Sequence, residues 1–287
     1  MIKLLALDLD GTLLNSQGEI PDKNREAVRR AEDAGVLVTI VTGRRFRDAR
    51  PVGLGLNLNA PLVTHNGALL KYAESLETVS VDLLSNDACL EIIRAGKRYG
   101  GDALVSADPN NKGVLLFDRV SDDNEPLQRY LRWAETLHGS EASEAVLNVE
   151  RLEDEIPNHE IIHISFSGAC AAMSEMELYL ERQLGGLVTI LTTVYPHRNF
   201  TLIDILPPNV SKGSGLKKLA AIKDVEPEEV MAIGDNFNDI EMLEFAGTPV
   251  VTGNADPNLI ERGEFYTTLS NDEAGVAAAI ERFILNA

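Results

Sequence analysis

The chain has 287 residues, of which 44% are hydrophobic, and its formal net charge is −19 at pH 7. This length suits two domains better than one, and the apolar fraction is enough for a sizeable core. So acidic a chain repels nucleic acid and anionic membrane surfaces, and neither is an expected partner. An anionic small molecule would bind only where a metal, a lysine or helix N-termini make the surface locally positive.

The cysteines and the N-terminus bear on the compartment. Cys89 and Cys170 are far apart and lack the spacing of a metal site, so no disulfide framework is implied and the reducing cytosol fits. The apolar run at residues 2–7 is too short to span a bilayer or to act as a signal peptide. We therefore expect a cytoplasmic protein. The oligomeric state stays open between a monomer and a homodimer.

The first dozen residues carry the main chemical signal. Residues 2–7 form a short, continuous apolar run, which is typical of a buried strand in a parallel sheet. Asp8 and Asp10 follow at once and would point to the same side, and Gly11 permits a tight turn. Two carboxylates at the carboxyl end of a strand lie where open α/β sheets bind ligands. Because like charges this close need a cation between them, the stretch predicts a Mg²⁺ site with one carboxylate free for catalysis. Taken alone, it could equally be a solvated turn after an edge strand.

A helix is predicted over residues 21–34 and a second buried strand over residues 36–41. A strand, helix, strand order implies a parallel crossover, which brings Thr42 beside Asp8. The Thr42 hydroxyl and neighbouring backbone N–H groups could then hold a phosphoryl oxygen. Taken alone, Thr42 would more simply be a helix N-cap.

A third short strand is predicted over residues 61–64, and the turn His65-Asn66-Gly67 follows it. Asn66 could face the same edge of the sheet, whereas His65 is better explained as a turn or packing residue. Residues 69–83 alternate in polarity like a hairpin that leads out of the core.

The pattern changes from about residue 84. Helices are predicted over residues 86–99, 125–138 and 171–184, and strands over residues 103–106, 113–117, 159–166, 187–194 and 200–206. This mixture suggests an α+β module with an antiparallel sheet, inserted into the first domain. A module placed over strand ends would act as a lid that shapes the pocket and excludes water.

The chain re-enters the core near Ser211, a good N-cap for a helix over residues 213–223. Lys212 therefore lies at a helix N-terminus, where the helix dipole disfavours a cation. A lysine in that position suggests an anion bound nearby. Taken alone, Lys212 would more simply be an exposed surface lysine.

The last part of the chain repeats the strand-end pattern. A strand over residues 230–233 ends at Asp235, and Asn238 could cap a helix that begins near Asp239. Another strand is predicted over residues 248–252. A final helix is predicted over residues 270–285, with a capping box formed by Ser270 and Glu273.

These stretches together resemble the haloacid dehalogenase-like phosphotransferase superfamily. The run Asp8-Leu9-Asp10-Gly11-Thr12-Leu13 matches its opening motif D-x-D-G-T-L. Its later motifs match Thr42-Gly43-Arg44, Lys212, and the G-D-x-x-N-D run from Gly234 to Asp239. The forms T-G-R, N-G-A and G-D-x-x-N-D-x-x-M-L are those of the Cof-type phosphatases.

The resemblance implies an α/β fold, with a Rossmann-like parallel-sheet core and an inserted α+β cap that sets substrate specificity. The implied core is residues 1–83 and 208–287, and the implied cap is residues 84–207. The resemblance covers the whole chain, but the cap resembles that of the family only in its placement and length.

The resemblance also implies a mechanism, in which Asp8 attacks the phosphorus of a small phosphomonoester to form an aspartyl-phosphate. Asp10 would protonate the leaving oxygen and later activate water. Lys212 would neutralise charge, and Asp239 would position Lys212 or a metal-bound water. The implied magnesium ligands are Asp8, the backbone carbonyl of Asp10, and Asp235. The implied phosphoryl-binding groups are Thr42, Gly43, Asn238 and the backbone N–H of Leu9, with Asn66 in support. Arg44 could contact the substrate or pair with a carboxylate, and the sequence does not decide between these roles.

Other functions stay open at this point. A phosphomutase of the phosphomannomutase type shares the fold and the core motifs. A non-catalytic phosphosugar-binding regulator would not need both Asp8 and Asp10. An NAD-dependent oxidoreductase is disfavoured, because no G-x-G-x-x-G follows the first strand. The substrate is equally open among sugar phosphates, phosphorylated cofactors such as pyridoxal phosphate or flavin mononucleotide, and small phospho-acids.

Overall fold

The computed structural model describes residues 1–286 and divides the chain into two compact units. The core unit comprises residues 1–44, residues 49–79 and the chain from Ser211 onward. The inserted unit comprises residues 80–210 together with the short segment Arg45–Asp48. The long insertion therefore separates residues 1–79 from the last part of the core, and the short segment Arg45–Asp48 is grouped with it.

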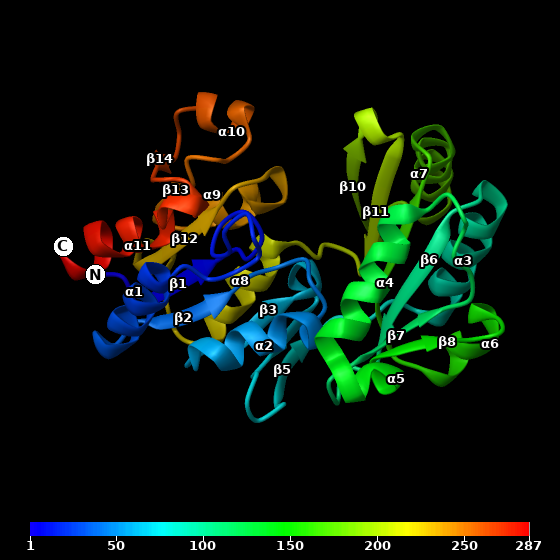
Figure 1. The fold of residues 1–287 in the computed structure, drawn as a ribbon, viewed down its shortest axis with the longest axis horizontal. Helices are drawn as coiled ribbons and strands as arrows, with labels where there is room; N and C mark the ends of the chain where they lie inside the picture. The colour runs from blue at the N-terminus through cyan, green and yellow to red at the C-terminus, as the bar shows by residue number, and fades with distance from the viewer. Residues whose placement is uncertain (287) are drawn as a thin grey trace. The chain divides into compact units, whose positions relative to one another are not determined.

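The core unit is built on a five-stranded parallel sheet, in the order β14-β13-β12-β1-β2 (Figure 1). The strands are β1 (Leu4–Leu7), β2 (Leu37–Ile40), β12 (Val230–Gly234), β13 (Thr248–Val251) and β14 (Tyr266–Thr267). All four residues of β1 are buried, as expected for a central strand covered on both faces. The predicted parallel-sheet core is confirmed, and the residues after β1, β2 and β12 emerge at one edge of this sheet.

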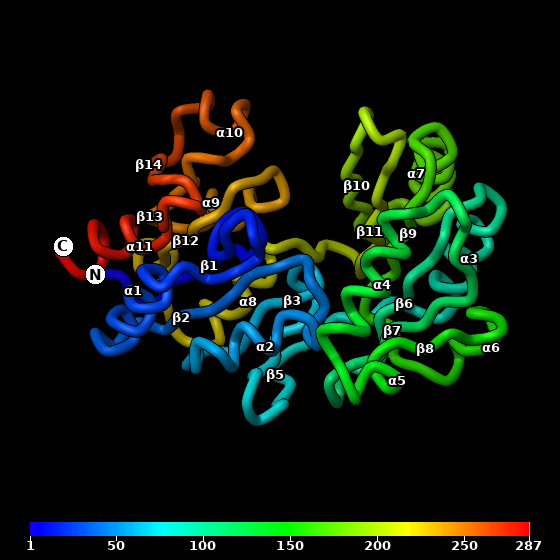
Figure 2. The backbone as a smooth tube through the Cα atoms, in the orientation of Figure 1, coloured from blue at the N-terminus to red at the C-terminus, as the bar shows by residue number. Residues whose placement is uncertain are grey.

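Helices cover both faces of the sheet. Leu4 and Ala6 pack with buried residues of α8 (Lys212–Ile222) and α9 (Ile240–Phe245). Leu5 and Leu7 point to the opposite face by strand alternation. There α1 (Asp22–Asp33) and α11 (Gly275–Ile280) pack against each other, so the first and last helices of the core unit are neighbours (Figure 2).

The remaining elements of the first eighty residues extend this layer. The bridge between Val41 and Val63 continues the parallel arrangement beyond β2. A three-stranded sheet follows, made of β3 (Leu62–Thr64), β4 (Leu69–Lys71) and β5 (Thr78–Val81). Helix α2 (Phe46–Leu56), which the sequence did not predict, begins in the segment grouped with the inserted unit. Near the end of the chain, the short helix α10 (Pro257–Glu261) follows β13.

The inserted unit has a six-stranded sheet in the order β10-β11-β9-β6-β7-β8. Its strands are β6 (Asp102–Ala107), β7 (Val114–Phe117), β8 (Val146–Asn148), β9 (Ile161–Gly168), β10 (Thr189–Tyr195) and β11 (Phe200–Leu206). All neighbours are antiparallel except β7 and β8. The α+β insertion predicted from the sequence is therefore confirmed as a separate unit with its own sheet.

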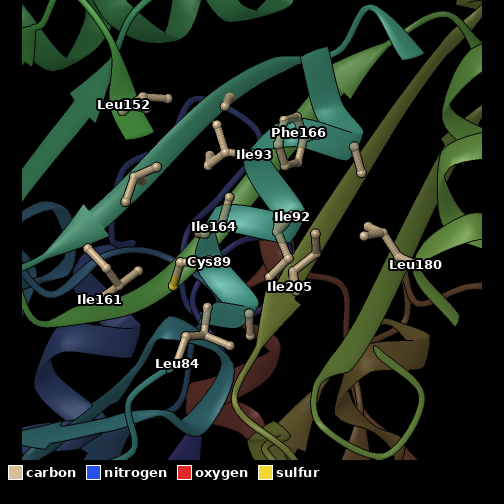
Figure 3. Close-up of a cluster of buried hydrophobic side chains, with 14 of the residues drawn as sticks. Leu84, Cys89, Ile92, Ile93, Leu152, Ile161, Ile164, Phe166, Leu180 and Ile205 are labelled. Carbon is tan, nitrogen blue, oxygen red and sulfur yellow. The ribbon is translucent and has the colours of Figure 1, made fainter. Parts of the chain in front are cut away.

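Helices complete the inserted unit. They are α3 (Asn86–Tyr99), α4 (Glu125–His138), α5 (Ala142–Ala145), α6 (Leu152–Glu155) and α7 (Cys170–Leu184). The hydrophobic cluster of Figure 3 joins Ile92 of α3, Phe166 of β9 and Leu180 of α7. Cys89 lies in this cluster, where burial raises the pKa of its thiol to about 12, so it packs as a small hydrophobic residue.

The predicted final helix over residues 270–285 is wrong as a single element. The predicted capping box of Ser270 and Glu273 forms, but it closes a single turn at Asn271–Glu273. Ala274 then adopts φ = 61°, a left-handed conformation that cannot continue a right-handed helix. The segment is therefore a turn followed by α11 and a wider turn at Glu281–Leu285. Within residues 1–286, no helix combines the length and apolar character needed to cross a membrane.

Candidate active site

Asp8 is the centre of the polar edge of the core sheet. Its backbone N–H donates to Ile233 O at 2.9 Å, which fixes the end of β1 beside β12. Its side chain is buried and its Oδ1 accepts a hydrogen bond from Lys212 Nζ at 2.6 Å. Burial raises the pKa of Asp8 well above its usual range, and the negative charges of Asp239 and Asp235 raise it further. The positive charge of Lys212 lowers this pKa, but by less than these effects raise it.

Lys212 links two carboxylates at the start of α8. Besides Asp8, its Nζ donates to Asp239 Oδ1 at 2.6 Å. Ser211 caps the helix and forms a capping box with Ser214, which fixes the backbone from which Lys212 projects. Burial alone would lower the pKa of Lys212, but the charges of Asp239 and Asp8 raise it above its usual value. A buried ammonium ion therefore stays charged at this helix N-terminus.

Asp239 uses both of its oxygens. While Oδ1 accepts from Lys212, Oδ2 accepts from the backbone N–H groups of Asp235 and Asn236, each at 3.0 Å. The N-cap of this turn is Asn236, so the capping role predicted for Asn238 is wrong. Asn236 is the cap because its Oδ1 accepts a hydrogen bond from the N–H of Phe237. Asn236 also forms a capping box with Asp239. Asn238 itself is exposed.

A group of carboxylates suits a metal ion. Among residues 1–286, Asp8, Asp235 and Asp239 form a cluster whose candidate ligand oxygens lie within 4.8 Å of one another. Burial, together with the charge of Asp239, raises the pKa of Asp235 to about 6. Because Asp239 is committed to Lys212 and two N–H groups, Asp8 and Asp235 are the better pair for a cation. Hard oxygen donors carrying excess negative charge are the donor set that Mg²⁺ prefers.

Two neighbours of Asp235 were not singled out from the sequence. The Thr12 hydroxyl, fully buried, donates to Asp235 Oδ1 at 3.3 Å. Gly11 has φ = 81°, and a Cβ added there would overlap the Asp235 carboxylate. Both residues belong to the D-x-D-G-T-L motif, so their place in that motif was the signal that could have indicated these roles.

Asp10 lies apart from the acidic cluster. The Asp10 side chain is 58% exposed. Its carboxylate accepts two hydrogen bonds from the Arg44 guanidinium, from Nε to Oδ2 at 2.8 Å and from Nη2 to Oδ1 at 2.6 Å. In the cluster the carboxylate beside Asp8 is that of Asp235, and a cation between Asp8 and Asp10 stays a prediction. The sequence left open whether Arg44 binds substrate or pairs with an acid, and here it pairs with Asp10.

The other predicted phosphoryl-binding groups lie on neighbouring loops. Thr42 is buried after β2, and its hydroxyl accepts the N–H of Arg44 at 3.1 Å. The N–H of Asn66 donates to Thr42 O at 3.0 Å, so the turn after β3 is tied to the end of β2. The side chain of Asn66 lies against Gly43, and within residues 1–286 its buried Oδ1 has no hydrogen-bond partner. Leu9 is buried directly after Asp8.

Comparison with known proteins agrees with this geometry. The sequence model of the haloacid dehalogenase-like hydrolases matches residues 5–280. The 5-amino-6-(5-phospho-D-ribitylamino)uracil phosphatase YwtE of Bacillus subtilis is 31% identical, with 99% of this chain and 98% of that protein covered. The pyridoxal phosphate phosphatase YbhA of Escherichia coli is 29% identical, with 88% and 89% covered. A haloacid dehalogenase-like hydrolase from Bacteroides thetaiotaomicron superposes with a TM-score of 0.81 at 26% identity, covering 99% of this chain and all of that one.

The class of protein is defined by these matches and by the parallel α/β core, which brings Asp8, Lys212 and Asp235 together at one edge of its sheet. The chain belongs to the haloacid dehalogenase-like hydrolases. Within that family it is a Cof-type phosphatase, a hydrolase of phosphoric monoesters.

Proposed function

We propose that this phosphatase depends on Mg²⁺ and hydrolyses a small phosphorylated metabolite through an aspartyl-phosphate on Asp8. One observation carries the proposal: Asp8 is a buried carboxylate held by Lys212 with Asp235 and Asp239 close by. A structural carboxylate would be balanced by its surroundings, whereas this one sits in an excess of negative charge. Such an excess suits a site that binds a cation and then a phosphoryl group.

Asp8 supplies the nucleophile. One of its oxygens attacks phosphorus, the bond to the leaving oxygen breaks, and the phosphoryl group is carried as a mixed anhydride. Lys212, already 2.6 Å from Asp8, offsets the negative charge that gathers as two anions meet. Asp239 accepts a second hydrogen bond from Lys212, so the ammonium ion is oriented before substrate binds.

Asp10 serves as acid and then as base. It gives a proton to the leaving oxygen and later takes one from the water that hydrolyses the acyl phosphate. Because Arg44 holds both Asp10 oxygens, Asp10 must leave this pair to reach the substrate. Arg44 is then released toward the substrate, which reconciles the pairing with the predicted substrate contact.

Asp8, Asp235 and the backbone carbonyl of Asp10 would hold Mg²⁺, which supplies Lewis-acid stabilisation of phosphoryl charge when bound. Thr42, Gly43, Asn238 and the N–H of Leu9 would bind phosphoryl oxygens. Asn66 supports this group through its bond to the Thr42 carbonyl.

The inserted unit is proposed as the cap that selects the substrate. The named substrates of two relatives define the first compounds to test, namely a phosphoribityl-aminouracil and pyridoxal phosphate. Sugar phosphates, flavin mononucleotide and small phospho-acids complete the panel. We also propose that the protein works in the cytoplasm, without nucleic-acid or membrane partners, as a monomer or homodimer.

The test is phosphate release from this panel, with Mg²⁺ or with EDTA, by wild type and Asp8→Asn. Mg²⁺-dependent release that Asp8→Asn abolishes supports the proposal, and the ranking of compounds identifies the substrate class. Sugar phosphates that are isomerised without phosphate release would favour a mutase. Binding without any turnover would favour a regulatory binding protein.

A further inference from the structure

The loop that carries Asp10 is held by three asparagine side chains, one from α1 and two from the C-terminal part of the core unit. The loop runs from Asp10 to Ser16, between β1 and α1. Three of its backbone carbonyls accept hydrogen bonds from side-chain amides. These bonds are Asn254 Nδ2 to Gly11 O at 2.8 Å, Asn24 Nδ2 to Leu13 O at 3.3 Å, and Asn271 Nδ2 to Leu14 O at 2.9 Å.

Two of these amides also connect to the C-terminal part of the chain. Asn24 Oδ1 accepts the backbone N–H of Ala277 at 3.0 Å, and Asn254 Oδ1 accepts that of Asn271 at 2.8 Å. A fourth bond runs from the N–H of Ser16 to Asp272 Oδ1 at 2.8 Å. Hydrogen bonds therefore link residues 271–277, near the C-terminus, to the Asp10 loop near the N-terminus, either directly or through Asn24 and Asn254.

The chemistry of these bridges requires an amide. A side chain that donates to one backbone carbonyl and accepts from one backbone N–H must carry both a donor and an acceptor at its tip. Asparagine meets this requirement with a short, stiff side chain, whereas ionised aspartate has no donor. Leu13 and Leu14 are buried, as are Asn24 and Asn271, so a carbonyl that lost its amide partner there would lie away from water.

The braced loop meets the active site at its other side. Thr12 donates to Asp235, and Gly11 lies against the same carboxylate. The Gly11 carbonyl, one residue after Asp10, accepts from Asn254 Nδ2 at 2.8 Å and more weakly from the Thr252 hydroxyl at 3.5 Å. Because Gly11 is joined to Asp10 and lies against the Asp235 carboxylate, we expect a shift of this carbonyl to disturb both.

We propose that Asn24, Asn254 and Asn271 are positioning residues that hold the Asp10 loop in its catalytic geometry. This inference rests on the proposed function, because it assigns the brace to the residue proposed as acid and base. It predicts that loosening the brace slows the chemical step more than it weakens substrate binding. It also gives residues 271–277 a part in positioning the Asp10 loop.

The first test is Asn254→Asp, since Asn254 is exposed and its replacement has the same shape. We expect kcat to fall about fivefold to tenfold, as for the loss of one hydrogen bond to a positioned group, while KM changes less than about twofold. Amide hydrogen exchange in a peptide covering residues 9–16 should rise about tenfold in the same variant.

The matched control is Asn59→Asp. Asn59 is also exposed and makes the same kind of bridge, donating to Val36 O at 3.1 Å and accepting from the N–H of Val38 at 2.9 Å. It touches β2 rather than the Asp10 loop. We expect Asn59→Asp to leave kcat and exchange in residues 9–16 at the wild-type level, although it loses the same kind of donor.

A second variant, Asn271→Asp, removes a buried member of the brace. Far-ultraviolet circular dichroism and the thermal midpoint establish first that it is folded, and we then expect a larger exchange increase than in Asn254→Asp. The inference is overturned if exchange in residues 9–16 is unchanged in Asn254→Asp, or if Asn59→Asp lowers kcat equally. Because exchange needs no turnover, a wild type that releases no phosphate would sink the proposed function while the brace is still tested.

Discussion

Asp8 and Asp48 are both buried aspartates, and their surroundings differ in charge balance. Asp48, at the start of α2, packs within the inserted unit. Its carboxylate accepts two bonds from Arg45, one from the Tyr130 hydroxyl and one from His138 Nε2, all at 2.9 Å. Burial opposes ionisation, yet these partners lower the pKa of Asp48 to about 2.

Asp8 shares one ammonium ion with Asp239 and stands beside Asp235, so its pKa is raised instead. The comparison shows that burial alone does not determine what a carboxylate does. Where donors and positive charge are sufficient, the carboxylate stabilises the fold. Where like charges are left in excess, the fold bears a local cost, and such places are candidates for cation and substrate binding.

The largest expected effect that separates the two aspartates is on turnover. Asp8→Asn should lower phosphate release by at least about 10³-fold, because the nucleophile is lost. Its free energy of unfolding should stay within about 1 kcal/mol of wild type, since the substitution removes a charge that burial opposes. Urea denaturation and a phosphate assay on the same preparation measure both. A variant that stays active would break the assignment of Asp8 as nucleophile.

Lys212→Met should produce the largest loss of stability. It leaves Asp8 and Asp239 without their shared cation in a buried site, which typically costs about 3–5 kcal/mol. Lys217→Met is the control, because Lys217 is exposed on the same helix and should cost less than about 1 kcal/mol. Equal losses in the two variants would mean that Lys212 is an ordinary helix lysine.

Asp48→Asn should cost about 2–3 kcal/mol of folding stability at pH 7 while phosphatase activity is kept. The folded-state pKa of Asp48, about 2, lies below the unfolded value near 4, so its contribution is present above pH 4 and is lost as pH falls through 2. Unfolding free energies measured between pH 5 and 2 should therefore converge for wild type and Asp48→Asn. Asp33→Asn, at an exposed pair with Arg29, should show a difference below about 0.5 kcal/mol. A gap between wild type and Asp48→Asn that persisted unchanged to pH 2 would contradict the balanced-charge explanation.

The smallest expected effect is metal stabilisation. Mg²⁺ at about ten times its Kd should raise the free energy of unfolding of wild type by about 1.4 kcal/mol relative to EDTA. Asp48→Asn should gain as much, whereas Asp235→Asn should gain little, because it has lost one of the two proposed carboxylate ligands. Thermal melts of the three proteins with Mg²⁺ and EDTA decide this. Equal gains in all three would place the ion elsewhere.

Local sequence patterns determined the elements and the chemistry of the sheet edge. The bounds of α3 and α4 agree with their predicted ranges, because hydrophobic period and caps are properties of adjacent residues. The N-cap at Ser211 was predictable for the same reason, since a cap lies next to the helix that it begins. The proximity of Asp8 and Asp235 was also predictable, because parallel strands end at one edge.

The tertiary structure alone decided the partners. The pairing of Arg44 with Asp10 joins residues that are far apart in the chain, as do the bonds from Tyr130 and His138 to Asp48 and from Asn254 and Asn271 to the Asp10 loop. The break at Ala274, where φ is 61°, was likewise not predicted, and Asn271 in the turn before it bonds to the distant Leu14 carbonyl. A sequence pattern encodes period and local capping, whereas side chains that are distant in the chain meet only where packing brings their backbones together.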